Sequence, residues 1–578
     1  MIFSVWAPHA KSVDLLLDER RIPLAPTAQG YWQADVPAHA GQDYKYSLDG
    51  APGLPDPRSR WQPAGVHGAS QVLEARVADA PIRKRSGFRA VPLNQAIIYE
   101  LHVGTFTPEG TYAAAQMKLP HLRELGVTHL ELMPLATFPG QRGWGYDGVD
   151  LFAPFPAYGT PAELQAFVRT CHACGLAVLL DVVYNHLGPD GNYLASYGPY
   201  FTDRYRTGWG AAINYDGPQS DEVRRFVIDN ALMWLKDYEM DGLRLDAVHA
   251  IFSFEAVHLL EDLSQAARTL SQELGRPLVL IAESDLNDPR LVHPVARGGY
   301  GLDAQWTDDF HHALHRYFTG ETGGYYADFH GLRDVATALR DGYVYQGQYS
   351  VHRGRRHGRA PAGVEPQQLI VSAQNHDQIG NRAQGERLSG LLEMAALKAI
   401  ATLTLLSPFV PLLFQGEEWG ASTPFLYFTD HQDAALGKLV AEGRSKEFSA
   451  FRWHGTVPNP QDSSTFERSK LDWSELAKPR HAELFEWHRR LIRLKKDRPE
   501  MPRESKVDAP RPQVNFDEGA EWLTFVHNGV LVALNWHDRA KAVPMPRGEW
   551  SLLMRSDSRE ALQAAVMPPR TTFIYIGG

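Results

Sequence analysis

Cysteine is almost missing from this sequence. Its 578 residues include only Cys171 and Cys174, so a secreted scaffold that depends on disulfides is excluded. The CxxC spacing occurs in redox and zinc sites, but this pair comes at the end of a predicted helix that Gly175 closes, whereas reactive pairs favour helix N-termini. No second CxxC is present, and we expect two cysteines that pack in the core.

Long apolar runs and blocks of basic charge are missing too. The longest apolar stretch, residues 399–414, contains two prolines and is too short to span a bilayer. The N-terminus, MIFSVWAPHAKSV, lacks the pattern of a signal peptide. The net charge is −10 and no basic block occurs, which argues against a nucleic-acid or membrane partner. We therefore expect a soluble cytoplasmic protein.

The composition that is present is that of a globular protein. Hydrophobic residues make up 44% of the chain and charged residues 22%, which excludes a mainly disordered or fibrous protein. Aromatic residues reach 11%, with 14 Trp and 23 Tyr. Flat side chains in this number are typical of proteins that stack on sugar rings, and a large core would use them equally well.

Both ends of the chain have the pattern of short β-strands. Residues 1–90 contain VDLLLD, GYWQADV and YKYSLDG between turn residues, which predicts a β-sandwich. A proline-rich loop at 54–63 and the basic stretch 83–89, interpreted as a solvated linker, lead to the next domain. Residues 504–578 contain EWLTFVH, NGVLVALNW and TTFIYIG, with Asn528-Gly529 as a hairpin turn. A C-terminal all-β domain is predicted there.

Residues 91–503 alternate between apolar runs of strand length and helical patterns, as at 220–240, 254–274 and 390–406. This indicates an α/β fold with a central (β/α)8 TIM barrel and insertions. The competing structure is an open doubly wound sheet, but no glycine-rich dinucleotide motif follows the first strand. The eight predicted strands lie in AIIYELHV, THLELMP, LAVLLDVV, GLRLDAV, PLVLIAES, AQWTDDF, QLIVSAQNHD and FVPLLFQGEE.

Polar residues follow several of these runs, at the strand ends where barrel enzymes place their catalytic groups. Collecting several carboxylates in one pocket costs free energy unless they are paired, so the concentration favours function over structure. Strand ends in barrels are often polar, however, so each residue alone is equally consistent with a functional role and with a structural one. The residues are Asp181, Tyr184, Asn185, His186, Arg244, Asp246, Glu283, Asp285, Asn375, His376 and Asp377.

Two of these acids fit the chemistry of retaining glycoside hydrolysis, in which one carboxylate attacks the anomeric carbon and a protonated one donates to the leaving oxygen. Arg244 lies two residues before Asp246, so both point to one face of the strand. The arginine would keep Asp246 ionised as a nucleophile. Glu283 follows the apolar LVLIA, a setting that raises a carboxyl pKa and keeps the acid protonated.

Four ordered motifs resemble those of the α-amylase superfamily, glycoside hydrolase family 13: DVVYNH at 181–186, GLRLDAVH at 242–249, IAES at 281–284 and QNHDQ at 374–378. The resemblance implies that Asp246 is the nucleophile, Glu283 the acid/base and Asp377 a third acid that grips sugar hydroxyls. The N-terminal FSVWAPHAKSVDLLL resembles the carbohydrate-binding β-sandwich of branching and debranching members. The residues predicted to bind substrate from the motifs and from GWGYD are Tyr146, Asp147, His186, Arg244, His249, His376 and Gln378.

Further stretches are similar to the trehalohydrolase subfamily of that family: IIYELHVGTFTPEGTY, YFTDRYRTGWGAAINYDG, WTDDFHHALH, QNHDQIGNR and PFLYFTDH. This resemblance covers nearly the whole chain. It implies hydrolysis of the α-1,4 bond next to the terminal α,α-trehalose of maltooligosyltrehalose, which releases trehalose and a maltooligosaccharide. It also implies a pathway link to the maltooligosyltrehalose synthase that makes the substrate.

Two alternatives remain from the sequence. A 1,4-α-glucan branching enzyme shares the first and last domains but transfers the glucan chain to a sugar hydroxyl, so its product distinguishes it. A non-catalytic glucan-binding protein with a decayed site is the other, and the presence of all three acids argues against it.

Weaker predictions concern the region after the sixth strand. Asp308, Asp309 and His311 are candidates for hydrogen bonds to trehalose, and Trp306 and Trp419 for stacking on sugars. Loops 306–312 and 425–431 would shape the preference for the trehalose end.

Metal binding has only weak signals. His311, His312 and His315 have metal-like spacing, but the resemblance requires no metal there. Asn185 matches a calcium-binding position of many amylases, yet the long insert that completes that site is lacking. We predict neither a metal nor a cofactor.

Overall fold

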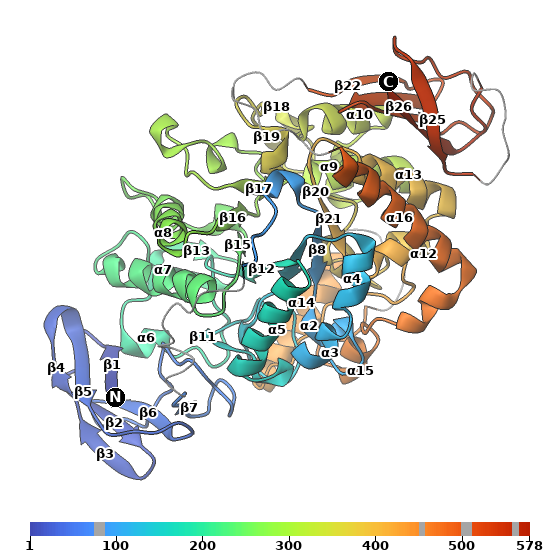
Figure 1. The fold of residues 1–578 in the computed structure, drawn as a ribbon. Coiled ribbons are helices and arrows are strands. Elements are labelled where there is room, and N and C mark those ends of the chain that lie inside the picture. The colour runs from blue at the N-terminus through green and yellow to red at the C-terminus, as the bar shows by residue number, and fades with distance from the viewer. Residues whose placement is uncertain (74–86, 450–456, 499–510, 558–565, 578) are drawn as a thin grey trace.

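The computed structural model describes residues 1–73, 87–449, 457–498, 511–557 and 566–577, with a closed barrel at its centre (Figure 1). Eight parallel strands close in the order β12-β15-β16-β17-β20-β21-β8-β9. All eight predicted strands are confirmed, and closure excludes the open sheet. Their bounds are β8 Ile98–Leu101, β9 His129–Leu132, β12 Ala177–Val182, β15 Gly242–Leu245, β16 Val279–Ala282, β17 Ala304–Trp306, β20 Leu369–Ser372 and β21 Val410–Phe414.

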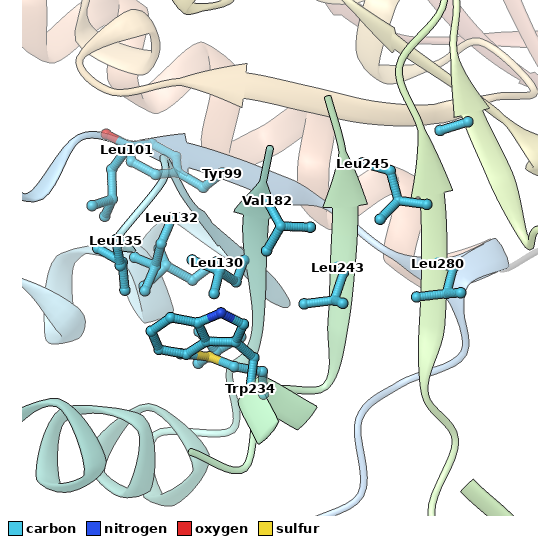
Figure 2. Close-up of a cluster of buried hydrophobic side chains, with 14 of the residues drawn as sticks. Tyr99, Leu101, Leu130, Leu132, Leu135, Val182, Trp234, Leu243, Leu245 and Leu280 are labelled. Carbon is cyan, nitrogen blue, oxygen red and sulfur yellow. The ribbon is translucent and has the colours of Figure 1, made fainter. Parts of the chain in front are cut away.

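Side chains alternate between the two faces of each barrel strand, as the strand period requires. In β12, Val178 and Leu180 belong to the large core between barrel and helices, whereas Leu179 belongs to the core inside the barrel. Figure 2 shows the outer layer, where leucines of neighbouring strands lie on the same side as Trp234 of helix α7 (Ser220–Lys236). Each fully buried leucine contributes about 1.5–3 kcal/mol to stability.

The inward side chains change character along the barrel axis. Ile98, Leu179 and Ile281 fill the N-terminal half with apolar groups. Asp181 and Arg244, further along β12 and β15, are buried and charged. Apolar side chains therefore fill one half of the barrel interior, and the charged side chains lie toward the C-terminal ends of the strands, where barrel enzymes have their active sites.

The helices surround the barrel. The three predicted helical stretches form α7, α8 (Leu259–Leu274) and α13 (Met394–Leu405). Helix α5 (Pro161–Ala173) begins with a capping box between Thr160 and Glu163. Cys171 is buried, Cys174 is half-buried, and both thiols are free. The other α-helices are α2 Val103–Phe106, α3 Tyr112–Gln116, α4 Leu119–Leu125, α6 Leu194–Tyr197, α9 Asp308–Thr319, α10 Leu332–Asp341, α11 His376–Gly380, α12 Leu388–Leu391, α14 Ala434–Ser449, α15 Ser463–Glu467 and α16 Pro479–Asp497.

The N-terminal residues form two small antiparallel sheets at one side of the barrel (Figure 1). Arg58 pairs with Asp229 of α7 at 2.8 Å, and Arg60 with Asp237 at 2.9 Å, so the two parts are joined by ion pairs. The predicted linker at 83–89 lies partly outside the described residues. The strands are β1 Ile2–Trp6, β2 Val13–Leu17, β3 Arg20–Pro23, β4 Ala25–Pro26, β5 Tyr31–Asp35, β6 Asp43–Leu48 and β7 Ser70–Gln71.

The C-terminal residues form one five-stranded sheet in the order β22-β23-β24-β26-β25. The predicted hairpin turn is confirmed, because Asn528 and Gly529 both have positive φ, 47° and 70°. Its strands are β22 Gln513–Asp517, β23 Trp522–His527, β24 Val530–Asn535, β25 Trp550–Arg555 and β26 Thr571–Gly577.

Two-stranded antiparallel sheets are inserted between barrel elements. They pair β10 (Ala136–Thr137) with β11 (Asp150–Pro154), β13 (Phe201–Thr207) with β14 (Gly210–Ile213), and β18 (Gln346–Ser350) with β19 (Arg355–Gly358). The last two pairs are hairpins with short turns. Within the described parts of the chain, we find no helix that combines the length and the apolarity needed to cross a bilayer.

Candidate active site

Arg244 lies at the centre of the polar end of the barrel. Its guanidinium is completely buried, and its Nη1 donates to both carboxylate oxygens of Asp181 (2.9 and 2.8 Å) and to Oδ1 of Asp246 (2.8 Å). Asn185 donates to Oδ2 of Asp246 at 2.7 Å. Burial alone raises the pKa of Asp246, but Arg244 and the other neighbours outweigh it, and the pKa is lowered. Asp246 is therefore held as a carboxylate.

Glu283 has the opposite environment. Burial raises its pKa to about 7, although Arg244 opposes this. Its Oε2 accepts from the backbone N–H of Ala247 at 2.6 Å and lies 3.8 Å from Nη2 of Arg244. Ala247, directly after Asp246, has a φ of 39°, which is a strained conformation for a residue with a Cβ. Asp246 and Glu283 thus share one arginine and have pKa values pushed apart, as acid/base pairs require.

Asp377 is the third predicted acid, and it stands in the short helix α11 with 45% of its side chain exposed. The preceding His376 is buried; its Nδ1 contacts Glu100, and its Nε2 lies 3.5 Å from Asp377. Burial lowers the pKa of His376, but the Glu100 carboxylate outweighs this and raises it to about 9. His376 therefore carries a positive charge beside Asp377 at neutral pH.

Tyr146 connects these groups. Its hydroxyl donates to Oδ2 of Asp181 at 2.6 Å and lies 2.7 Å from Nε2 of His376, and its ring stacks on that histidine at 5.2 Å. His186 bonds the backbone oxygen of Tyr146 at 2.9 Å. The side chain of Asp147 lies 4.0 Å from His431, and burial raises its pKa.

Trp209 was not among the residues predicted for the site. This residue lies in the turn between β13 and β14, is 53% exposed, and stacks on His186 with ring centroids 3.7 Å apart and planes 10° apart. The signal in the sequence was an aromatic residue between two glycines in a polar insertion. Trp209 therefore lies directly against His186, one of the residues predicted to bind substrate, and about half of its surface is exposed.

Arg353 and Asp285 were not predicted to bind substrate, and they lie close to His249, which was. Arg353, from the β18–β19 hairpin, pairs with Asp285 at 2.8 Å, and the predicted residue His249 lies 4.0 Å from the same carboxylate. All three side chains keep between about a quarter and a third of their surface exposed. Gln378 donates to Asp308 at 3.3 Å, and burial raises the pKa of Asp308, with Glu283 adding to the effect.

Two residues predicted to bind trehalose are buried, and their side chains are bonded to other parts of the protein. Asp309 is buried, and its Oδ2 accepts from Asn287 and from the backbone N–H groups of Val344 and Tyr345, all at 2.8 Å. His311 is buried and bonds the backbone oxygen of Ala373 and the hydroxyl of Tyr326. Their hydrogen bonds connect loops to one another, so these two predictions are corrected.

The two predicted stacking tryptophans are corrected as well. The ring of Trp306 is buried inside the barrel with the guanidinium of Arg244 at 4.4 Å from its centroid. Trp419 has no exposed surface and contacts Trp473 and His121. Neither ring has a face that a sugar could cover.

The histidines of α9 and Asn185 carry the weak metal-binding signals of the sequence. Among the described residues, no group of three or more His, Cys, Asp and Glu side chains is arranged to hold a metal ion. His315 instead bonds Glu321, and Asn185 bonds Asp246.

The chain is similar to known carbohydrate-active proteins along nearly its whole length. Residues 84–206 match the alpha amylase catalytic domain, and residues 1–62 match carbohydrate-binding module 48, the isoamylase N-terminal domain. Malto-oligosyltrehalose trehalohydrolase of Rhizobium sp. (strain M-11) is 49% identical over 96% of this chain and 94% of its own. The same-named enzyme of Saccharolobus solfataricus is 41% identical over 92% and 90%.

More distant relatives share less. The 1,4-alpha-glucan branching enzyme of Bacillus caldolyticus is 33% identical over 53% of this chain and 50% of its own. A crystal structure from Salmonella typhimurium, of a protein provisionally named an alpha amylase, superposes with a TM-score of 0.88 at 36% identity. It covers 100% of this chain and 97% of that one.

Proposed function

This chain belongs to the malto-oligosyltrehalose trehalohydrolase family, and from that premise we propose that it hydrolyses the α-1,4 bond next to the terminal α,α-trehalose of maltooligosyltrehalose. The products are trehalose and a maltooligosaccharide. The observation that carries the proposal is the pair of carboxyls at Arg244: the pKa of Asp246 is lowered and that of Glu283 is raised to about 7.

The proposed chemistry proceeds in two steps with retention. The Asp246 carboxylate attacks the anomeric carbon, and Glu283 gives its proton to the oxygen of the departing trehalose. Glu283, now ionised, takes a proton from water, and the resulting hydroxyl displaces Asp246 from the sugar. Asp377 beside the charged His376 is suited to bind sugar hydroxyls through its exposed carboxylate. Each bond formed has a matching bond broken, and Glu283 regains its proton.

The trehalose end is assigned to the side of the site that holds His249, Asp285 and Arg353. These groups are charged and partly exposed, and His249 is close enough to Glu283 to oppose the rise that burial causes in its pKa. Glu283 must contact the departing oxygen. Asp308 and Gln378 complete this polar wall. Such groups reject a sugar that leaves them unpaired, because an unsatisfied polar group costs free energy. In the cell, this activity would follow a synthase that builds maltooligosyltrehalose; a cytoplasmic location stays a prediction.

The proposal is tested by comparing two substrates of similar size. Maltotriosyltrehalose and maltopentaose are incubated with the protein separately, and the released sugars are resolved over time. We expect rapid release of trehalose from the first and slow attack on the second. Equal attack on both would indicate a general α-1,4-glucanase. Formation of α-1,6 branches on amylose without trehalose release would indicate a branching enzyme, the activity named for the relative that matches half of this chain.

A further inference from the structure

Asp190 joins three separate parts of the molecule near the active site. It lies in the loop after β12, and its side chain is almost completely buried. One carboxylate oxygen bonds Nε2 of His67, from the N-terminal domain, at 3.1 Å. The other accepts from the backbone N–H groups of Gln432 and Asp433, at 2.7 and 3.2 Å. The carboxylate therefore holds a domain and a distant loop together through three hydrogen bonds.

The loop that Asp190 holds reaches the wall of the sugar site. His431 directly precedes the two residues whose amides bond Asp190, and its imidazole lies 4.0 Å from the carboxylate of Asp147. Asp147 follows Tyr146, which bonds Asp181 and His376 in the centre of the site. A shift of this loop would move His431 away from Asp147 and change the wall beside Tyr146.

Besides its ion pairs with α7, the N-terminal domain contacts the loop after β12, which contains Asp190. Its ion pairs from Arg58 and Arg60 go to α7 and the residue following it, whereas His67 reaches the loop after β12. Its Nδ1 lies 2.7 Å from the hydroxyl of Tyr193. The chains approach closely here, because a Cβ on Gly191 would lie 2.3 Å from Cγ2 of Val66. The contact is therefore closely fitted although His67 is 47% exposed.

We propose that Asp190 is a positioning residue for substrate binding. Through it, the N-terminal domain, by way of His67, holds segment 430–433 against the wall formed by Tyr146 and Asp147. The domain thus contributes to binding of the glucan chain without touching the sugar through this contact. This inference rests on the proposed function, since the bound chain is that enzyme's substrate.

The test measures kcat and KM for maltotriosyltrehalose in D190A, D190N, H67A and the double variant H67A/D190A. We expect KM to rise about five- to tenfold in D190A, because two backbone amides lose their acceptor, while kcat stays within about twofold. H67A should raise KM about two- to threefold. If His67 acts only through Asp190, the double variant should match D190A, as a double-mutant cycle requires. D190N keeps one acceptor oxygen in the same shape and should fall between wild type and D190A.

Asp241 supplies the matched control. Its carboxylate also bonds a histidine, His172 at 2.8 Å, and a backbone amide, Val178 at 2.9 Å, but it does so directly before β15, at the opposite end of that strand from Asp246. D241N should change thermal stability and leave KM unchanged. A KM increase of the same size in D241N would show that the effect of D190A is a general loss of stability.

Two results would overturn the inference: an unchanged KM in D190A, or effects of H67A and D190A that multiply. A binding measurement distinguishes failure of this inference from failure of the proposed function. Maltopentaose is titrated onto E283Q forms of the same variants, where weaker binding in the D190A form is expected even if the wild type releases no trehalose. Failure of trehalose release by the wild type would contradict the proposed function alone; equal maltopentaose affinity in all forms would contradict the role of Asp190.

Discussion

Asp246 and Asp309 each follow a strand of the barrel, and their carboxyls are held in opposite ways. Asp246 is bonded by the side chains of Arg244 and Asn185, which converge on one point. Asp309 is bonded by the backbone amides of Val344 and Tyr345 and by Asn287. The first arrangement sets the charge of a group that faces Glu283; the second fixes the path of a loop.

The pKa values of the two acids follow the same division. Arg244 and its neighbours bring the pKa of Asp246 below its usual range in spite of burial. Burial raises the pKa of Asp309 to about 6, and its hydrogen bonds only limit the rise. A buried acid paired with an arginine in a cleft is therefore a better candidate for chemistry than one that caps backbone amides.

The substitution Asp246→Asn should have the largest effect on activity and so tests the difference between Asp246 and Asp309 most strongly. An amide cannot attack the anomeric carbon, so kcat/KM for maltotriosyltrehalose should fall by a factor on the order of 10⁴. The melting temperature should stay close to that of the wild type, because the amide fills the same space. Steady-state kinetics and calorimetry on one preparation measure both. An active D246N would remove the nucleophile from this account.

The next largest effect concerns pH and Glu283. The acid must be protonated to donate, and its pKa is raised to about 7. As pH rises above that value, kcat/KM should fall by about fiftyfold between pH 7 and pH 9 and approach a tenfold loss per pH unit. A pH–rate profile of the wild type measures this. A profile that stays flat to pH 9 would contradict the assignment of Glu283 as the acid.

Arg353→Ala tests the polar wall beside Glu283. Removal of the arginine leaves Asp285 without its 2.8 Å partner, and the ratio of kcat/KM for maltotriosyltrehalose over maltopentaose should fall about tenfold. Arg290 is the control, since it also pairs with an aspartate, Asp288 at 2.6 Å, but more than half of its side chain is exposed. R290A should leave the ratio unchanged. Equal ratios in R353A and wild type would place trehalose recognition elsewhere.

Asp309→Ala should have the smallest effect on activity. The substitution leaves two buried backbone amides without an acceptor and should lower the free energy of unfolding by about 2–4 kcal/mol. The same ratio of kcat/KM values should change less than twofold. Denaturant unfolding and the two-substrate assay measure these quantities. A changed ratio with unchanged stability would return Asp309 to the substrate site.

The sequence was sufficient where local pattern decides the structure. Eight apolar runs predicted eight strands, and the polar residues after them, Asp246 and Glu283 among them, lie at the same end of the barrel because the strands are parallel. The lowered pKa of Asp246 and the raised pKa of Glu283 agree in direction with the environments inferred from Arg244 and from the apolar LVLIA. Short-range spacing was enough for both.

The sequence was insufficient where packing between distant segments decides the structure. Trp209 and Arg353 come from inserted hairpins, and no local pattern says where a hairpin tip rests. Asp308 and Asp309 begin the same helix, where successive residues point about 100° apart; only the fold shows which one faces the site. Trp306 and Trp419 have the right chemistry for stacking, but their exposure depends on the final core.

The most direct measurement is proton NMR of maltotriosyltrehalose hydrolysis at early times, before the released sugar changes its anomeric form. The two-carboxyl account of Asp246 and Glu283 predicts free trehalose together with maltotriose in the α-anomer, because two displacements at one carbon retain configuration. Maltotriose in the β-anomer would mean a single displacement by water and no role for Asp246 as a nucleophile. A mixture of glucose and maltose without trehalose would contradict the substrate itself.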